Sequence, residues 1–345
     1  MENKRNLKIL NYWLIICCSM VFIMVFIGGL TRLTQSGLSI VEWNVFSGII
    51  PPINTNDWIA LFDKYKEFPE YKLVNINLSL KEFKFIFWME YFHRIWGRLI
   101  FLLFLIPLII FLIKKYIPKK LEKHFFTIGI LILFQGFVGW YMVKSGLVDN
   151  PDVSHYRLAI HLLIAFIIYG YMLLLTLTIN DLINKKKRIV QNKNFFFLNI
   201  LLILLVLITV FSGAMVAGLN AGLVYNTFPL MGENFIPDEI FNLNPIYLNL
   251  FENPVTVQFD HRFLGITNFI LILTIWFYAR KNSLSEKIKI KINFLLFAVI
   301  LQIGLGIATL LSYVTLPIAL AHQLGALFVY SISIWTFKSL PFMSK

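Results

Sequence analysis

The stretch Glu90-Tyr91-Phe92-His93-Arg94 begins a long apolar run, and Gln258-Phe259-Asp260-His261-Arg262 begins another run 168 residues later. Each stretch places a histidine and an arginine side by side at the start of a hydrophobic segment. A pattern that returns at a fixed spacing indicates that one structural unit is built twice. We therefore predict two similar halves, residues 1–190 and residues 191–345.

Other features of the chain return at nearly the same spacing. They are Gln135 and Gln302, His161 and His322, Gly29 and Gly213, and the segments 36–52 and 221–237. The repeated unit therefore extends over several apolar runs.

The composition is typical of a protein that crosses a membrane many times, because 58% of the 345 residues are hydrophobic and only 14% are charged. Runs long enough to cross a bilayer lie at about residues 12–30, 92–113, 125–143, 158–179, 195–217, 263–279, 292–311 and 316–337. We predict an all-α fold of eight transmembrane helices in two four-helix bundles. Because each half has an even number of spans, the halves should form a parallel pseudo-twofold repeat.

The basic residues predict how the chain is oriented. A net charge of +13 is compatible with nucleic-acid binding, but the lysines and arginines cluster before the first span and after the second, fourth and sixth spans. The connection 218–260 contains acidic residues but no lysine or arginine, and the connection 312–315 contains no charged residue. Short basic connections stay on the cytoplasmic side. We therefore predict cytoplasmic N and C termini, a retained first helix and no nucleic-acid partner.

Four histidines, His93, His161, His261 and His322, lie near the start of the second, fourth, sixth and eighth spans. With the predicted orientation, all four are at the depth of the outer leaflet. Imidazole is costly in hydrocarbon unless it has a partner. Within each half the two histidines could hold one haem iron across a helix bundle. The alternative is that each histidine only hydrogen-bonds a neighbouring helix.

Other polar and small residues near these histidines have more than one interpretation. Arg94 and Arg262, with Arg98 and Arg157, could pair with haem propionates, or their side chains could extend to the lipid headgroups. The glycine pairs at 136 and 139 and at 304 and 306 are expected to make close helix contacts. The remaining histidines, His124 and His155, are expected to be solvated surface residues.

Glu90 distinguishes the two halves, because the equivalent position is Gln258. Glu90 lies three residues before His93, and therefore on the same face of a helix. A carboxyl group can relay protons, whereas an amide can only hydrogen-bond. We therefore predict that the chemistry occurs in the first half. The alternative is a structural ion pair between Glu90 and Arg94.

The two long outer connections are expected to cover the two pockets. The first, residues 31–91, contains an amphipathic stretch from Asp57 to Tyr65 that suits a membrane surface. The second, residues 218–260, is rich in Asn, Pro and aromatic residues. Cys17 and Cys18 lie inside the first span, where we expect them to be small apolar fillers.

Several motifs resemble the haem A synthase family, in the branch without an outer-loop cysteine pair. They are residues 67–72 (EFPEYK), 82–98 (EFKFIFWMEYFHRIWGR), 154–161 (SHYRLAIH), 213–231 (GAMVAGLNAGLVYNTFPLM), 257–262 (VQFDHR) and 319–323 (ALAHQ). The resemblance covers nearly the whole chain.

The resemblance implies a membrane oxidoreductase that converts the C8 methyl group of haem O to a formyl group, giving haem A for cytochrome oxidase. It implies that His261 and His322 bind haem b and that His93 and His161 bind the substrate haem. The essential glutamate of the family corresponds to Glu90. Implied partners are haem O, oxygen, an electron donor, the enzyme that makes haem O and membrane lipid, and an oligomer is compatible with the sequence.

Two other functions remain open from the residues alone. A dihaem electron carrier would also use histidine pairs, and a duplicated transporter could line a polar path with them. The sequence has no recognisable transit leader, so we expect a bacterial cytoplasmic membrane.

Overall fold

The computed structural model describes residues 2–42, 49–146, 151–185, 193–282 and 284–339. Within these ranges the chain is helical, and eight of its helices are long and apolar enough to cross a membrane. They are α1 (Glu2–Leu33), α4 (Leu80–Ile113), α5 (Lys119–Gly146), α6 (His155–Ile183), α7 (Lys193–Gly218), α9 (Pro254–Lys281), α10 (Glu286–Leu311) and α11 (Leu316–Lys338). The prediction of eight spans is confirmed. The predicted boundary between residues 190 and 191 lies outside the described ranges.

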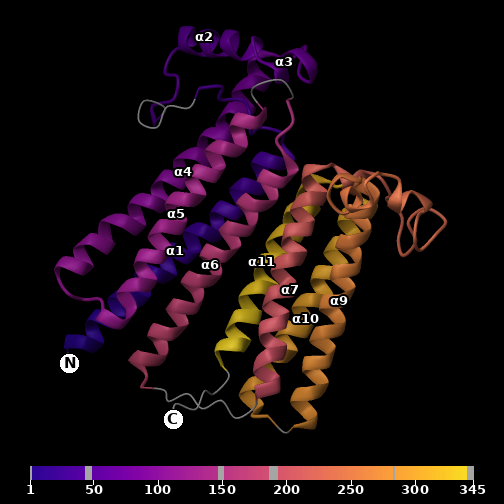
Figure 1. Cartoon of the computed structure of the whole chain (residues 1–345). Helices are drawn as coiled ribbons and strands as arrows, with labels where there is room; N and C mark the ends of the chain where they lie inside the picture. The colour runs from indigo at the N-terminus through magenta and orange to yellow at the C-terminus, as the bar shows by residue number, and fades with distance from the viewer. Residues whose placement is uncertain (1, 43–48, 147–150, 186–192, 283, 340–345) are drawn as a thin grey trace.

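The spanning helices pack in two groups (Figure 1). Helix α1 packs against α4 and α6, and α5 packs against α6; in the second group, α7 and α10 each pack against α9 and α11. The groups meet where α6 contacts α7 and α11, and where α11 contacts α1. Tyr169 of α6 and Ser331 of α11 share a hydrogen bond of 2.8 Å there. Helix α1 begins, and α11 ends, on the side of the molecule opposite α2 (Figure 1).

Helix α4 starts twelve residues before the apolar run that predicted it, at Leu80 instead of residue 92. Two local features explain the early start. Ser79 and Glu82 form a capping box, in which each side chain binds the backbone N–H of the other residue. The first turns of α4 also bury Phe83 and Phe87 against the preceding connection. The helix therefore extends beyond its apolar run.

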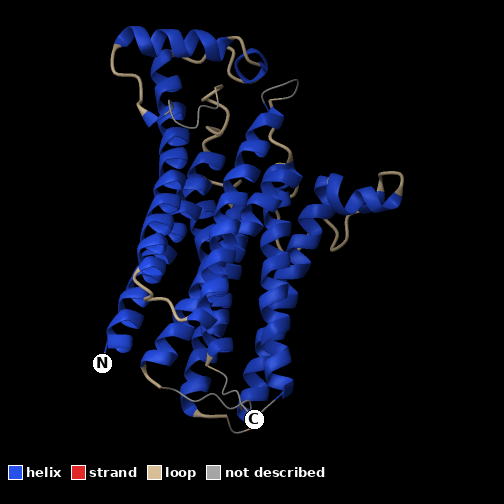
Figure 2. Cartoon of the chain, turned by 60° about the vertical axis from the view of Figure 1, so that its left-hand side comes forward, coloured by secondary structure: helices blue, strands red, loops and turns tan. Residues whose placement is uncertain are grey.

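The first outer connection folds into a small cap, residues 54–75, which contains α2 (Thr55–Lys66) and α3 (Pro69–Leu73). Figure 2 shows α2 lying across the end of the bundle. The predicted amphipathic stretch is helical, but its apolar side chains, Trp58, Phe62 and Tyr65, are buried against α4. The expectation that this face rests on the membrane surface is therefore wrong, because the start of α4 covers it.

The second outer connection is built from short helical turns, η2 (Ala221–Leu223), η3 (Asp238–Phe241), η4 (Ile246–Leu248) and α8 (Asn249–Glu252). Asparagine side chains organise it. The buried Asn249 accepts a hydrogen bond from the backbone of Leu243 at 3.0 Å, and Asn253 donates to the carbonyl oxygen of Glu239 at 2.7 Å. These side-chain bonds satisfy backbone groups that have no hydrogen-bond partner in a regular helix or sheet.

Candidate functional site

Each of the four intramembrane histidines lies against a glycine on a neighbouring helix. His93 of α4 faces Gly28 of α1, and His161 of α6 faces Gly139 of α5; His261 of α9 faces Gly213 of α7, and His322 of α11 faces Gly306 of α10. A Cβ atom at these glycines would lie 3.3, 3.0, 2.9 and 2.9 Å, respectively, from the Cε1 atom of the ring. The absence of a side chain therefore makes room for each imidazole.

These contacts correct two predictions about glycines. The counterpart of Gly213 is Gly28, whereas Gly29 faces Gln323 and Leu320 of α11. Gly136 and Gly304 are not close helix contacts, because nothing lies within 4 Å of a Cβ atom at either position. In both predicted pairs the second glycine makes the contact, and its neighbour is an imidazole.

His261 and His322 face each other, with ring centres 6.3 Å apart and ring planes at 86°. Two imidazoles on opposite sides of one iron have centres about 6 Å apart, given metal–nitrogen bonds of about 2 Å and about 1 Å from nitrogen to ring centre. The Nδ1 atom of His261 is buried without a hydrogen-bond partner. The residues of the second half therefore fit a haem held between two histidines.

A glutamine supports one histidine in each half. Gln302 donates to the backbone oxygen of His322 at 2.9 Å, and its Nε2 atom lies 3.1 Å from Nδ1 of the same ring. Gln135 makes the corresponding bonds to His161, at 3.0 Å to the backbone oxygen and 3.2 Å to Nε2. Side chains that bond to a ligand residue fix the orientation of its ring.

In the first half, His93 of α4 and His161 of α6 each lie against a glycine of a neighbouring helix. The Nδ1 atoms of both rings are buried and have no hydrogen-bond partner. Across the described residues, His, Cys, Asp and Glu side chains form no cluster of three or more that could hold a metal ion.

Glu90 of α4 is buried, with 3% of its surface exposed, and four donors surround its carboxyl group. Arg94 donates to Oε1 through Nη2 at 2.6 Å and through Nε at 3.0 Å. The Ser39 hydroxyl and the Ile40 backbone N–H each donate to Oε2 at 2.8 Å. An acceptor-only carboxylate matches this set of donors. The alternative ion pair of Glu90 with Arg94 is thus present.

Sequence reasoning missed Ser39. Its hydroxyl is buried and bonds to Glu90, whereas the equivalent position in the second half is the exposed Val224. The signal was available, because Ser39 and Val224 occupy corresponding places in the duplicated segments 36–52 and 221–237. Ser39 and Glu90 both occur only in the first of the two halves, and they contact each other.

The arginines bind protein groups. Arg94 and Arg262 each donate to two or more backbone oxygens of an outer connection. Arg157 donates to the Tyr141 backbone oxygen at 2.7 Å and lies over the Tyr141 ring at 3.7 Å. Arg98 is half-buried on α4. Arg94, Arg157 and Arg262 thus stabilise the outer ends of the helices.

His124 and His155 are not solvated surface residues. His124 lies 2.7 Å from the Tyr171 hydroxyl, because the cytoplasmic ends predicted for α5 and α6 pack together. The His155 side chain is only 15% exposed, with Nε2 3.5 Å from a Glu252 carboxylate oxygen. The second outer connection brings Glu252 over the start of α6 and covers this histidine.

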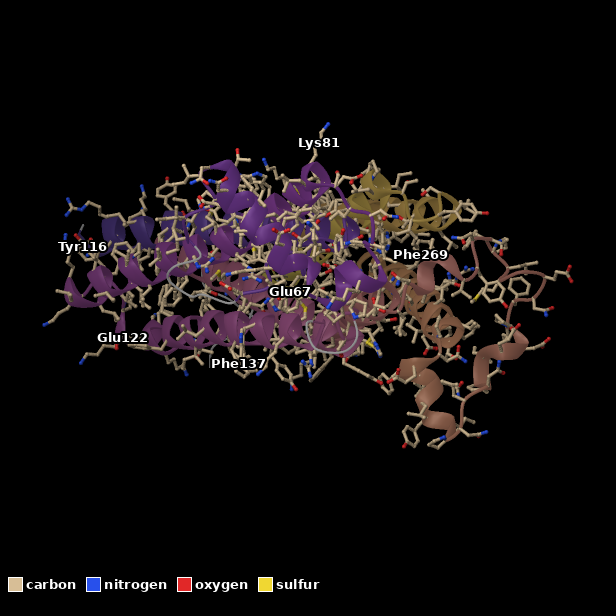
Figure 3. All side chains as sticks on the ribbon, turned by 90° about the horizontal axis from the view of Figure 1, so that it is seen from above. Glu67, Lys81, Tyr116, Glu122, Phe137 and Phe269 are labelled. Atoms are coloured by element: carbon tan, nitrogen blue, oxygen red, sulfur yellow. The ribbon has the colours of Figure 1, made fainter. Side chains whose placement is uncertain are left out.

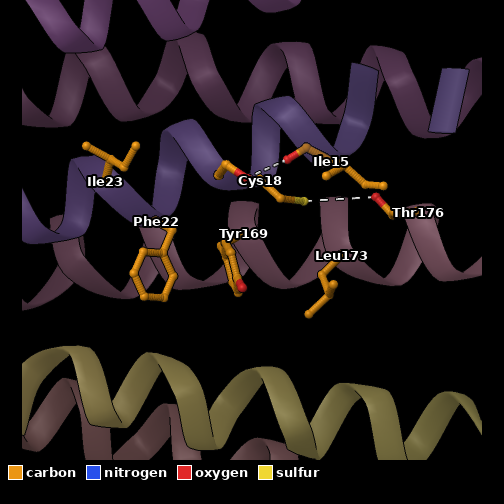
Figure 4. A pocket seen from close by; sticks show the side chains of 8 residues that line it. Ile15, Cys18, Phe22, Ile23, Tyr169, Leu173 and Thr176 are labelled. Carbon is orange, nitrogen blue, oxygen red and sulfur yellow. Dashed lines mark hydrogen bonds between the residues drawn. The ribbon is translucent and has the colours of Figure 1, made fainter. Parts of the chain in front are cut away.

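Two cavities lie away from the four histidines. A cavity of about 270 Å³ lies between α1 and α6, and Figure 4 shows its side chains, which include Cys18, Phe22 and Tyr169. Cys17 and Cys18 are buried and unpaired, as predicted for apolar fillers. A second cavity, of about 490 Å³, lies between residues 152–156 and 218–220 at the outer ends of α6 and α7.

The fold defines a multi-pass membrane protein that carries four histidines between its helices. The chain belongs to the COX15-CtaA family of cytochrome oxidase assembly proteins, whose model matches residues 11–334. It is 49% identical over 331 residues to a protein of Nitrosospira multiformis named heme A synthase, covering 95% of this chain and 92% of that protein.

Similar relatives occur in other bacteria and in animals. A heme A synthase of Wolbachia pipientis is 44% identical over 329 residues, covering 95% of this chain and 96% of that protein. Heme A synthase COX15 of Bos taurus is 41% identical over 354 residues, covering 100% of this chain and 85% of that protein. The resemblance drawn from the motifs is confirmed.

Proposed function

We propose that this chain is a haem A synthase, which oxidises the C8 methyl group of haem O to a formyl group for cytochrome oxidase assembly. The observation that carries this proposal is the His261–His322 pair, whose spacing of 6.3 Å matches two imidazoles on one iron. It stands in a chain whose relatives are named for the same activity. The methyl group would pass through an alcohol and then a hydrated aldehyde that loses water.

The two pockets have different tasks in this proposal. His261 and His322 hold haem b, and His93 and His161 hold the substrate haem. A haem held by protein ligands supplies electron transfer when it is bound. Gln135 and Gln302 keep the imidazoles in place, and the glycines behind the rings let them lie deep between the helices.

Glu90 is the proposed catalytic residue of the first pocket. Because it lies one helical turn from His93, its negative charge stands beside the substrate at the membrane edge. Arg94, Ser39 and the Ile40 N–H hold this charge in one position. A fixed anion stabilises positive charge that develops on a methyl carbon during oxidation. The neutral Gln258 gives the second pocket no such charge.

The orientation and the symmetry belong to the same proposal. The recurring histidine–glycine and histidine–glutamine contacts support a parallel repeat of four-helix units. The basic connections support cytoplasmic termini in a bacterial cytoplasmic membrane. Oxygen, an external electron donor and the enzyme that makes haem O are the proposed partners, in a lipid environment and without nucleic acid.

Co-expression with a source of haem O, followed by extraction and chromatography of the haems, tests the proposal. Wild type should yield haem A. His93→Ala should abolish haem A and leave the haem of the second pocket, whereas His261→Ala should lose that haem. Glu90→Gln makes the halves alike, so it should keep bound haem and lose the product. An electron carrier would keep its function in Glu90→Gln, and a transporter would show no Soret band.

A further inference from the structure

The cap of residues 54–75 contains a second buried carboxyl group, that of Glu70 on α3. Only 7% of this residue is exposed. Within the described part of the chain, its carboxyl group has one protein donor, the Tyr65 hydroxyl, at 2.9 Å, and no ion pair. Asn75 in turn donates to the Tyr65 oxygen at 2.8 Å and so fixes the direction of the hydroxyl. A carboxyl group buried without a cation is costly to ionise.

Glu70 and Glu90 are therefore held in opposite ways. Glu90 is bound by the Arg94 guanidinium, the Ser39 hydroxyl and the Ile40 N–H. Glu70 has no cation among the described residues, and it lies in the cap outside the spanning helices. Of the two buried carboxyl groups at this end of the molecule, Glu70 is the one placed to change its protonation.

Three effects act on the pKa of Glu70. Burial raises it most, the Tyr65 hydrogen bond lowers it, and the negative charge of Glu90 raises it, with the result that the pKa is about 7. Tyr65 of α2 and Glu90 of α4 are thus the titratable groups that act on Glu70 from the elements packed around it. Packing also links the two carboxyl groups, because Ile40, whose backbone N–H binds Glu90, packs against the aromatic cluster that contains Tyr65.

We propose that Glu70 is the proton-exchange residue of the first pocket, which takes up a proton from the outer water and releases it as the charge beside Glu90 changes. The step moves one proton and no electron: a hydronium ion of the outer water gives its proton to the Glu70 carboxylate, where an O–H bond forms, and that O–H bond breaks when the proton returns to the same water. This role rests on the proposed function, because the charge of Glu70 would affect a reaction that takes place beside Glu90. Glu70 acts through the charge of the pocket, and it is a positioning residue.

Infrared difference spectroscopy of the purified protein in lipid, recorded from about pH 5 to about pH 9, tests the exchange directly. We expect a protonated-carboxyl band that disappears with a midpoint near 7 in wild type and is missing from Glu70→Gln. Tyr65→Phe removes the bond that lowers the pKa, so it should move the midpoint to higher pH. Glu67→Gln is the matched control, because Glu67 is an exposed residue of the same cap, labelled in Figure 3.

The rate of haem A formation across the same pH range tests the catalytic part. Glu70→Gln should keep bound haem, lower the rate several-fold and remove the change in rate near neutral pH, while Glu67→Gln keeps the wild-type profile. A wild-type rate and profile in Glu70→Gln, or a carboxyl band that does not titrate in this range, would overturn the proposal. If wild type forms no haem A, the proposed function fails, and the infrared titration still decides whether Glu70 exchanges protons.

Discussion

Arg94 and Arg262 bind the backbone in the same pattern. Arg94 donates to the carbonyl oxygens of Ile40 and Glu42, and Arg262 donates to those of Tyr225 and Thr227, at distances from 2.9 to 3.2 Å. In each half the two acceptors are two residues apart, and the acceptors of one half lie 185 residues from those of the other. Each arginine therefore ties an outer connection to the helix that carries a histidine.

The residue one helical turn before the arginine is Glu90 in the first half and Gln258 in the second. This difference predicts that removing Arg94 and removing Arg262 will have unequal effects on stability. Arg94→Ala leaves the Glu90 charge buried, which should cost about 3–5 kcal/mol of stability. Arg262→Ala leaves the neutral Gln258 and should cost about 1–2 kcal/mol. Thermal unfolding of both variants in the same detergent measures the difference. Adding Glu90→Gln to Arg94→Ala should recover part of the loss; equal losses in the two single variants would contradict the ion-pair argument.

The glycines behind the imidazoles should be intolerant of a methyl group. In Gly306→Ala the new Cβ atom would lie 2.9 Å from the His322 ring, so the ring must leave its present position opposite His261. We expect at least a tenfold loss of haem affinity in the second pocket, about 1.4 kcal/mol, measured by titration of haem into the apoprotein. Gly304→Ala is the control on the same helix, where a Cβ atom has open space. A normal affinity in Gly306→Ala would exclude this packing role.

Ser39 should matter for activity more than its counterpart does. Ser39→Ala removes one of the donors that hold Glu90 and should cost about 1.5–3 kcal/mol of stability. Because Glu90 is then held less firmly, haem A yield should fall while bound haem stays constant. Val224→Ala, at the corresponding place in the second half, should change neither quantity. Chromatography of the extracted haems measures the haem A yield of both variants. Equal yields in Ser39→Ala and Val224→Ala would show that Ser39 has no role in activity.

Glu70 should make stability depend on pH. Its pKa is about 7 in the folded protein against 4.5 for an ordinary carboxyl group, so the folded state favours the protonated form. The stabilisation is complete below about pH 4.5 and is lost as pH rises to about 7. Glu70→Gln removes this dependence, and above pH 7 the variant should gain on the order of 3 kcal/mol relative to wild type. Unfolding midpoints of wild type and Glu70→Gln at several pH values measure this difference. The same dependence of stability on pH in both proteins would contradict the prediction.

Much of the architecture was predictable from the sequence. Eight apolar runs predict eight spanning helices, since a bilayer demands about twenty apolar residues from each span whatever its neighbours are. The repeat from Glu90 to Arg94 and from Gln258 to Arg262 predicted which histidines correspond. It also predicted that Glu90 is the asymmetric residue, because comparing the two copies needs no coordinates.

The boundaries and partners outside the apolar runs were less accessible. The early start of α4 depends on Ser79 and on aromatic packing with α2, and the burial of His155 depends on a connection that arrives from about one hundred residues away. The spacing of apolar residues predicts which segment is helical and apolar. It does not predict which distant segment will pack against that helix.

The sequence by itself determined the number of spanning helices and which of them carry the four histidines, because both follow from local composition and spacing along one chain. Only the tertiary structure decided that His261 and His322 face each other, that Ser39 and Ile40 donate to Glu90 from about fifty residues away, and that Glu70 is buried without a cation. The distances and burial of these side chains depend on how separate helices and connections pack, and that packing sets the charge each group can carry.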